Sequence, residues 1–312
     1  MADQNSDAQY SKDQHPIFSE FSDFKYTPTD PSDVLRFDEP PFIPHVYGLL
    51  QAVLHSSERS SRTHRLATVA IEHNQSNPTA WLIRRQSAET LAKDDKSIWE
   101  KEMAYCASII TNSAKNYQAW EYRRFCATKF GHQHEREFAD IVLAEDEKNY
   151  HAWAHRAWLV RNGLRKAELE ATEWYITRDL RNNSAWNHRW VVLTLTGALE
   201  ERGEEEMQFA LSQMKLADRN EAVWNFIQAL YERGIGCELA LEAAREAIAK
   251  DELCLPARRF VVWATLKPGK EGNEDVKKHC AFLAEKDAVR RKYWQSLVGD
   301  ADEDTDEDTE EQ

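Results

Sequence analysis

Apolar residues recur along most of this chain at the spacing of amphipathic helices. In the stretch from Glu135 to Glu147, for example, Phe138, Ile141, Val142 and Ala144 fall on one helix face. A stretch of this kind precedes each copy of a motif in which Asn stands four residues before Trp. The pattern therefore predicts paired helices, with the motif opening the second helix of each pair.

The Asn–Trp motif occurs five times, and Ala or Val always precedes the Trp. The copies are Asn77/Trp81, Asn116/Trp120, Asn149/Trp153, Asn182/Trp186 and Asn220/Trp224. Asn is favoured at a helix start, where its side chain accepts a backbone hydrogen bond. The tryptophans lie 39, 33, 33 and 38 residues apart, a period typical of arrays built from one supersecondary unit. We expect an all-α array of repeated helical hairpins.

Four copies of the motif carry Arg three residues after the Trp, so both side chains share a helix face. These are Arg84, Arg123, Arg156 and Arg189, whereas the fifth copy has Ile227. Because large apolar rings at helical spacing are usually buried, we expect the tryptophans to hold neighbouring hairpins together. We expect a structural role for the arginines too, since a guanidinium bonds well to carboxylates and carbonyls at packed positions.

Both ends of the chain differ from the repeats. Residues 1–45 are polar and lack helical periodicity, which predicts a flexible arm that docks by its aromatic side chains. These aromatics are Phe18, Phe21, Phe24 and Tyr26. Residues 300–312 carry nine acidic residues and no basic one, which predicts a disordered tail. The single period predicts one repeat domain over residues 46–299.

The acidic balance of the chain comes from its ends. The formal net charge is −14, yet residues 46–299 sum to +1, so the acidity says little about the partners of the repeats, and we expect no nucleic-acid partner. No signal peptide or long apolar run is evident, which predicts a soluble, cytoplasmic protein without a transmembrane segment. The five cysteines are spread singly, which favours buried reduced thiols over disulfides or a cysteine-based zinc site.

A basic residue precedes the Asn in four successive repeats. These residues are Lys115, Lys148, Arg181 and Arg219. Stacked repeats would align them at one edge beside helix N-termini, where free amides and dipoles favour phosphate or carboxylate. The alternative is that they pair with nearby acids such as Glu145, Glu147 and Asp179, because surface ion pairs are common.

Motifs for independent catalysis are absent from the sequence. His151 and His155 have a spacing that can hold a metal, but Glu does not follow His151 and no third ligand is evident, so His151 is better placed to hydrogen-bond a ligand. The chain also lacks a Gly-rich phosphate loop, a nucleophile elbow and an aspartate-rich magnesium motif. On these residues alone, it resembles a scaffold that contributes polar groups to another chain's active site.

The repeats resemble those of the protein prenyltransferase alpha subunit. The resemblance rests on three segments and extends roughly from Tyr47 to Trp294, without the tails. The segments are Lys115-Asn116-Tyr117-Gln118-Ala119-Trp120, Lys148-Asn149-Tyr150-His151-Ala152-Trp153 and Arg181-Asn182-Asn183-Ser184-Ala185-Trp186-Asn187-His188-Arg189. The family in question is the alpha chain shared by protein farnesyltransferase and geranylgeranyltransferase type I.

This resemblance implies a right-handed superhelical crescent that wraps around a beta subunit. The heterodimer would transfer a farnesyl or geranylgeranyl group from its diphosphate to the cysteine thiol of C-terminal CaaX proteins. Zinc bound by the beta subunit would activate the thiol, and magnesium would accompany the diphosphate. Neither metal has identifiable ligands in this sequence.

The same resemblance assigns roles to residues of the second and third repeats. Lys115 matches the lysine that reaches the diphosphate, where a cation stabilises charge on the leaving group. Gln118 matches the glutamine that bonds the peptide's terminal carboxylate. The lipid and diphosphate end of the cleft would be lined by Tyr117, Asn149, Tyr150 and His151.

Two alternative functions remain open at this point. One is the alpha subunit of the Rab-specific geranylgeranyltransferase, against which the Tyr117-Gln118 pair argues. The other is a non-catalytic scaffold of the tetratricopeptide type, whose usual Gly and Tyr spacings do not occur in this sequence. The sequence also departs from the resemblance at Pro78, where an aromatic is usual, and at Ile227.

Overall fold

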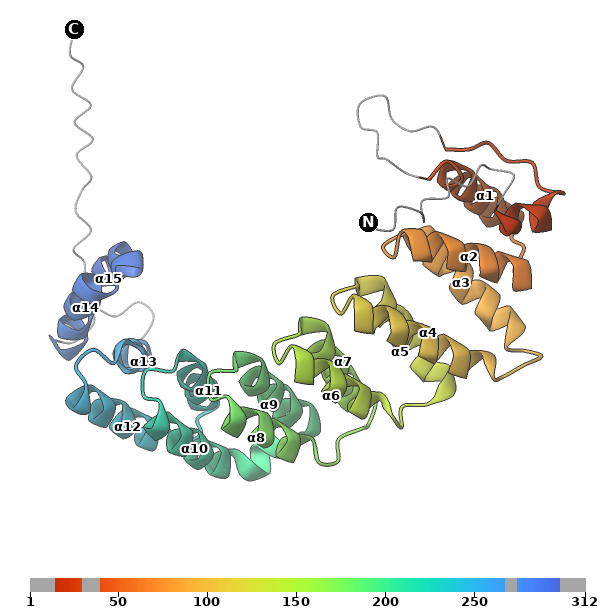
Figure 1. The fold of residues 1–312 in the computed structure, drawn as a ribbon. Helices are drawn as coiled ribbons and strands as arrows, with labels where there is room; N and C mark the ends of the chain where they lie inside the picture. The colour runs from red at the N-terminus through yellow and green to blue at the C-terminus, as the bar shows by residue number, and fades with distance from the viewer. Residues whose placement is uncertain (1–14, 30–39, 267–273, 298–312) are drawn as a thin grey trace, which may run out of the picture. The chain divides into compact units, whose positions relative to one another are not determined.

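The computed structural model describes residues 15–29, 40–266 and 274–297, and all regular elements in these ranges are helices (Figure 1). The elements are η2 (Pro16–Phe21), α1 (Ile43–Ser56), α2 (Ser61–His73), α3 (Pro78–Leu91), α4 (Ile98–Asn112), α5 (Tyr117–Phe130), α6 (Glu135–Glu145), α7 (Tyr150–Arg161), α8 (Glu168–Arg178), α9 (Asn183–Thr196), α10 (Ala198–Leu216), α11 (Glu221–Glu232), α12 (Cys237–Lys250), α13 (Leu255–Thr265), α14 (Glu274–Lys286), η3 (Ala288–Arg290) and α15 (Arg291–Ser296). The predicted all-α class is confirmed.

The helices form two compact units that divide between Leu159 and Val160, within α7. In the first unit α2 packs on α3, α4 on α5 and α6 on α7; in the second, α8 packs on α9, α10 on α11, α12 on α13 and α14 on α15. The second helix of five of these pairs begins directly after the Asn of the motif. The predicted array of helical hairpins is therefore confirmed.

Each motif Asn caps the second helix of its hairpin through its side chain. The carboxamide oxygen of Asn116 accepts from Ala119 N at 2.8 Å, and that of Asn149 accepts from Ala152 N at 3.0 Å. Asn77, Asn182 and Asn220 do the same. These bonds satisfy amides that a helix leaves unpaired in its first turn.

The motif Trp and the Asn of the next repeat bond to one shared carbonyl. In the first unit the Trp81 indole donates to Gln75 O at 2.8 Å, and the Asn116 amide donates to the same oxygen at 3.0 Å. Trp120 and Asn149 share Ala114 O, and in the second unit Trp186 and Asn220 share Leu180 O. All five tryptophans are buried. The motif therefore fixes the register of one hairpin on the next.

The motif arginines are buried and bonded to carboxylates on the first helix of a hairpin. Arg84 binds Glu102, Arg123 binds Glu135 and Arg189 binds Glu206, each through two guanidinium nitrogens. Arg156 contacts Asp140. The structural role expected for these arginines is therefore what the structure shows.

Two of these carboxylates also bind a side chain of the following helix. Glu102 accepts from the Tyr122 hydroxyl at 2.7 Å, and Glu135 lies 2.9 Å from His155 Nε2. Each carboxylate thus joins the Arg of one repeat to a polar residue of the next. Because a buried charge is tolerated only when it is paired and hydrogen-bonded, such networks favour one arrangement of adjacent hairpins.

A sixth, degenerate copy of the motif opens α13 and has no Asn or Trp. Cys254 is the residue before this helix, and its thiol lies 3.1 Å from Asp218 O. The Trp224 indole donates to the same oxygen at 2.7 Å. Cys254 therefore takes the place of the Asn side chain, while Arg258 stands at the Trp position.

The described part of the N-terminal segment packs on α1 and α2. Phe21 is buried, and the Arg62 guanidinium lies over its ring at 4.9 Å from the centroid. Gly48 of α1 faces the Thr27 backbone so closely that a side chain would collide with it. Aromatic docking of this segment is thus present, and α1 already begins at Ile43, inside the expected arm. Residues 1–14 and the acidic tail lie outside the described residues.

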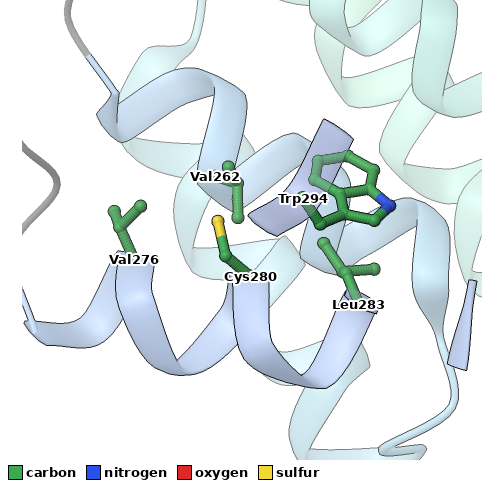
Figure 2. Close-up of a cluster of buried hydrophobic side chains, with 5 residues drawn as sticks. All are labelled: Val262, Val276, Cys280, Leu283 and Trp294. Carbon is green, nitrogen blue, oxygen red and sulfur yellow. The ribbon is translucent and has the colours of Figure 1, made fainter. Parts of the chain in front are cut away.

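The C-terminal end of the second unit has its own apolar cluster, shown in Figure 2. Val262 of α13, three residues of α14 and Trp294 of α15 form it; the α14 residues are Val276, Cys280 and Leu283. The Trp294 indole donates to Asp287 Oδ2 at 3.2 Å. The last described hairpin thereby buries apolar side chains of α13, α14 and α15 against one another.

The helices and the cysteines can be compared with the predicted lack of a transmembrane segment and the predicted buried thiols. No helix in the described ranges has the length and apolar character needed to cross a membrane. All five cysteines are free thiols; four are buried and Cys237 is half-buried.

Candidate functional site

The six predicted site residues lie at two neighbouring turns of the first unit. Lys115, Tyr117 and Gln118 belong to the turn before α5 and its first residues, whereas Asn149, Tyr150 and His151 belong to the corresponding place at α7. The Asn149 amide donates to Ala114 O at 3.3 Å, which fixes one turn beside the other. The structure thus brings the two sequence segments together.

Asn149 itself is committed to the fold. Its side chain is fully buried, its oxygen caps α7 and its amide nitrogen holds Ala114 O. It therefore determines where Tyr150 and His151 are placed.

His151 lies at the centre of an aromatic cluster. Its ring meets the Tyr117 ring edge-on at a centroid distance of 4.3 Å and the Tyr150 ring at 5.3 Å. It also lies nearly parallel to the buried Trp120 ring, at 6.2 Å. Only 4% of His151 is exposed, whereas Tyr117 and Tyr150 are each 67% exposed. The two tyrosines thus form an exposed aromatic surface on a buried imidazole.

The surroundings of His151 favour its neutral form. Burial lowers the pKa of His151, and the charge of Arg124 lowers it further, while a backbone hydrogen bond with Lys115 acts in the opposite direction. A neutral imidazole can donate from one nitrogen and accept at the other. Its link to the Lys115 backbone also couples it to the turn that carries the predicted catalytic lysine.

Lys115 has an exposed side chain with one loose contact. Its ammonium lies 3.6 Å from Asp146 Oδ2, and 80% of the side chain is accessible. An ion pair of this kind contributes little to stability and is easily exchanged for another partner. Lys115 can therefore redirect its charge to an anion without disturbing the hairpin.

The predicted row of basic residues is partly engaged by acids of neighbouring repeats. Besides the Lys115–Asp146 contact, Arg219 donates to Asp251 at 2.5 Å in the second unit. The pairing alternative therefore holds for these two residues. Their partners are turn residues one repeat further along, and not the acids singled out in the sequence.

Tyr117 and Gln118 also line an open cavity of about 430 Å³ between α3 and α5. The other lining residues are Pro78, Trp81, Leu82, Arg85, Glu121, Tyr122, Arg124 and Phe125. Arg85 stacks its guanidinium on Phe125 at 3.8 Å from the ring centroid, whereas Arg124 binds Glu121 at 3.0 Å. The cavity combines an aromatic wall with a neutral amide, two cations and the Glu121 carboxylate that pairs with Arg124. It suits a ligand that has both an apolar part and a carboxylate.

Sequence reasoning did not identify this cavity. Three of its lining residues, Leu82, Arg85 and Phe125, follow the motif tryptophans on the same helices. Their positions just after the motif could have pointed to this cavity from the sequence. The pairing of α3 with α5 across two hairpins, however, only becomes evident in the folded chain.

Packing explains the spacing of His151 and His155, which by itself could have held a metal ion. His155 is fully buried and bonds to Glu135, and no three potential ligands gather anywhere in residues 15–29, 40–266 and 274–297. His155 is thus bonded to Glu135, and both histidine rings pack on Trp120.

A second cavity, of about 450 Å³, lies in the second unit between α11, α13 and α15. Trp224, Phe260, Trp263 and Trp294 form much of its wall. It contains none of the predicted site residues. Its size alone therefore gives no reason to move the candidate site away from the two turns of the first unit.

Comparison with known proteins identifies both the repeats and the fold. The sequence profile of the protein prenyltransferase alpha subunit repeat matches residues 99–130, 132–163 and 166–196. The first two of these segments contain all six predicted site residues. No curated protein matches the chain in a sequence search.

Among solved structures, the chain is similar to one from Candida albicans protein geranylgeranyltransferase-I complexed with GGPP. The TM-score is 0.75 at 22% sequence identity, and the match covers 89% of this chain and 98% of the other. This likeness establishes the shared fold. The chain therefore carries three copies of the protein prenyltransferase alpha subunit repeat within that fold.

Proposed function

We propose that this chain is the alpha subunit of a heterodimeric protein prenyltransferase acting on CaaX proteins. The observation that supports this most is the cluster of Lys115, Tyr117, Tyr150 and His151 at two adjacent turns of profile-matched repeats. The beta partner would supply most of the lipid pocket. The lipid would be farnesyl or geranylgeranyl diphosphate.

In this function Lys115 would stabilise the departing diphosphate. Its accessible ammonium and loose contact with Asp146 leave it able to turn toward an anion. A cation aimed at charge that develops in the transition state lowers the barrier more than it strengthens ground-state binding. The exposed tyrosines would contact the lipid diphosphate, with His151 holding their rings apart.

Gln118 would bind the terminal carboxylate of the peptide. It lies in the wall of the 430 Å³ cavity, where apolar and cationic groups occur together. A carboxylate that leaves water requires donors at its new position. The Gln118 amide offers two, so its loss would weaken peptide binding more than lipid binding.

Zinc and magnesium are implied by the proposed chemistry. The described residues of this chain include no cluster that fits a metal, so we assign the zinc site to the beta subunit and place magnesium with the diphosphate. Zinc would convert the substrate thiol to a thiolate. The roles proposed for Lys115 and Gln118 require neither ion as a ligand of this chain.

Co-expression with a prenyltransferase beta chain tests the proposal. We expect a soluble one-to-one complex that transfers farnesyl or geranylgeranyl to a CaaX peptide, with both lipids assayed. A chain that stays free and supports no transfer would contradict the proposal and would agree with the scaffold alternative. Modification of Rab proteins but not of CaaX peptides would instead support the Rab-specific enzyme.

A further inference from the structure

A basic depression lies in the first unit, apart from the proposed active-site residues. Its volume is about 730 Å³, and it is formed by the α1–α2 connection and the C-terminal parts of α3 and α5. Three cations line it, namely Arg59, Lys93 and Lys129, together with one carboxylate, Glu89. Three positive charges and one negative charge give +2.

Arg59 is held in a fixed orientation by neutral acceptors. Its Nε donates to Gln86 Oε1 at 2.5 Å, and its Nη1 donates to the carbonyls of Val53 and Glu58. No carboxylate in the described ranges binds this half-buried guanidinium. A partly buried charge normally has a counter-charge, and no described residue supplies one to Arg59, so this cation is available to an anionic ligand.

Lys93 and Lys129 extend the cationic surface around Arg59, and nearby carboxylates neutralise little of their charge. Lys93 is exposed and contacts no described carboxylate, while Lys129 lies 3.7 Å from Glu89. Lysines at helix ends commonly complement the helix dipole, which explains their sequence positions. That explanation does not extend to Arg59, because it lies in the connection before α2.

We propose that this depression binds the phosphate group of a phosphorylated peptide segment. A phosphoserine or phosphothreonine side chain carries about −1.5 to −2 charge at neutral pH, which matches the +2 of the lining groups. Because Nε and Nη1 of Arg59 are engaged, its Nη2 remains to donate a charge-assisted hydrogen bond to a phosphate oxygen. The concave shape is larger than a phosphate alone, so it has room for flanking backbone, whereas a flat bilayer surface would not enter it.

Binding of a labelled peptide pool to the full chain, in complex with its beta partner if it requires one, tests this proposal. The pool has a fixed phosphoserine between randomised positions, and the same pool with serine is the reference. We expect binding of the phosphorylated pool only. Lys93→Gln should weaken it about tenfold, the effect of losing one charge-assisted contact, and Lys93→Arg should retain it.

The matched control is Lys101→Gln, which removes another exposed lysine, on α4 and not in the lining of the depression. Equal binding of both pools, or equal weakening by Lys93→Gln and Lys101→Gln, would overturn the proposal. So would binding of phosphatidylserine vesicles or inorganic phosphate without any binding of the phosphorylated pool. Because none of these variants touches the prenyl-transfer residues, CaaX activity reports separately on the proposed function.

Discussion

The two faces of helix α5 differ in whether their polar groups find partners within the protein. On the buried face, Trp120 and Arg123 bond to Ala114 and Glu135, so their polar groups are satisfied within the protein. On the exposed face, Tyr117 has ring contacts only, and the neighbouring Lys115 has one loose ion pair. One helix thus combines a fixed packing surface with a surface whose polar groups remain available to a ligand.

The same contrast separates what repeats from what varies. The buried Arg–carboxylate network recurs as Arg84–Glu102 and Arg123–Glu135, with Tyr122 or His155 as the third member. The exposed residues at the helix starts differ between copies. A substitution on the buried face should therefore cost stability, and one on the exposed face should cost activity.

The largest expected effect is on stability, from Glu135→Ala. This change leaves Arg123 without its carboxylate in the core, and breaking a buried ion pair costs about 3–5 kcal/mol. Glu137→Ala on the same helix is the control, because Glu137 is exposed and its described ion pair is with the exposed His134. Urea unfolding monitored by circular dichroism should separate the two variants. A loss of less than about 1 kcal/mol for Glu135→Ala would show that the network does not hold the hairpins.

Lowering the pH should reduce the stability of the folded protein by protonating the buried Glu102 carboxylate. Burial raises the pKa of Glu102, but the hydrogen bond from His64 and the charge of Arg84 outweigh this and bring it to about 2, from an ordinary 4.5. A carboxyl with a lowered folded pKa stabilises the protein above its unfolded pKa, and that stabilisation is lost as the pH falls from about 4.5 to 2. The shift corresponds to about 3 kcal/mol.

The measurement for Glu102 compares the wild type with Glu102→Gln across this pH range. The difference in unfolding free energy between the two should shrink as the pH falls. If the difference in unfolding free energy stays constant from about pH 5 to about pH 2, Glu102 does not titrate with a lowered pKa.

On the exposed face, Lys115→Ala should lower the single-turnover rate of prenyl transfer about 100-fold, since removal of one group that stabilises transition-state charge typically costs that much. Stability and heterodimer formation should be unchanged, because the side chain is exposed. Lys101→Ala is the matched control, as its ammonium has a similarly loose contact, 3.5 Å from Asp95. An unchanged rate for Lys115→Ala would remove this residue from the site.

The smallest effect is expected for Gln118→Ala. We expect the peptide KM to rise several-fold, about 1 kcal/mol for one neutral hydrogen bond, while lipid affinity stays the same. Gln208→Ala on α10 serves as a control for loss of a surface amide. A change confined to lipid diphosphate binding would contradict the role assigned to Gln118.

Local parts of the fold could be predicted from the sequence because their causes are local. An Asn before a helix caps that helix, and a Trp at a fixed offset lies on its packed face, so the hairpins and their second helices follow from the motif. The structural role of the arginines could also be anticipated. Their partners could not, since Glu102 and Glu135 lie on other helices and no rule of helical spacing connects them to Arg84 and Arg123.

Other features depend on contacts that a sequence pattern does not reveal. Cys254 acts in place of Asn only because its thiol reaches Asp218 O in the folded chain, so the sixth copy is invisible to a search for Asn and Trp. The cavity beside Gln118 requires α3 and α5 to lie together across two hairpins. The proposed site residues rest on a resemblance, because nothing in their own chemistry indicates an isoprenoid.

The shared carbonyl acceptors have a consequence for how such a chain can change length. The oxygens that receive a Trp and the Asn or Cys of the next repeat belong to Gln75, Ala114, Leu180 and Asp218, four residues with unrelated side chains. The junction is encoded by main-chain geometry and places no demand on the amino acid that provides the acceptor. A hairpin duplicated or grafted at such a turn would therefore bring its own connector with it, and only its buried carboxylate would need matching to the new neighbour.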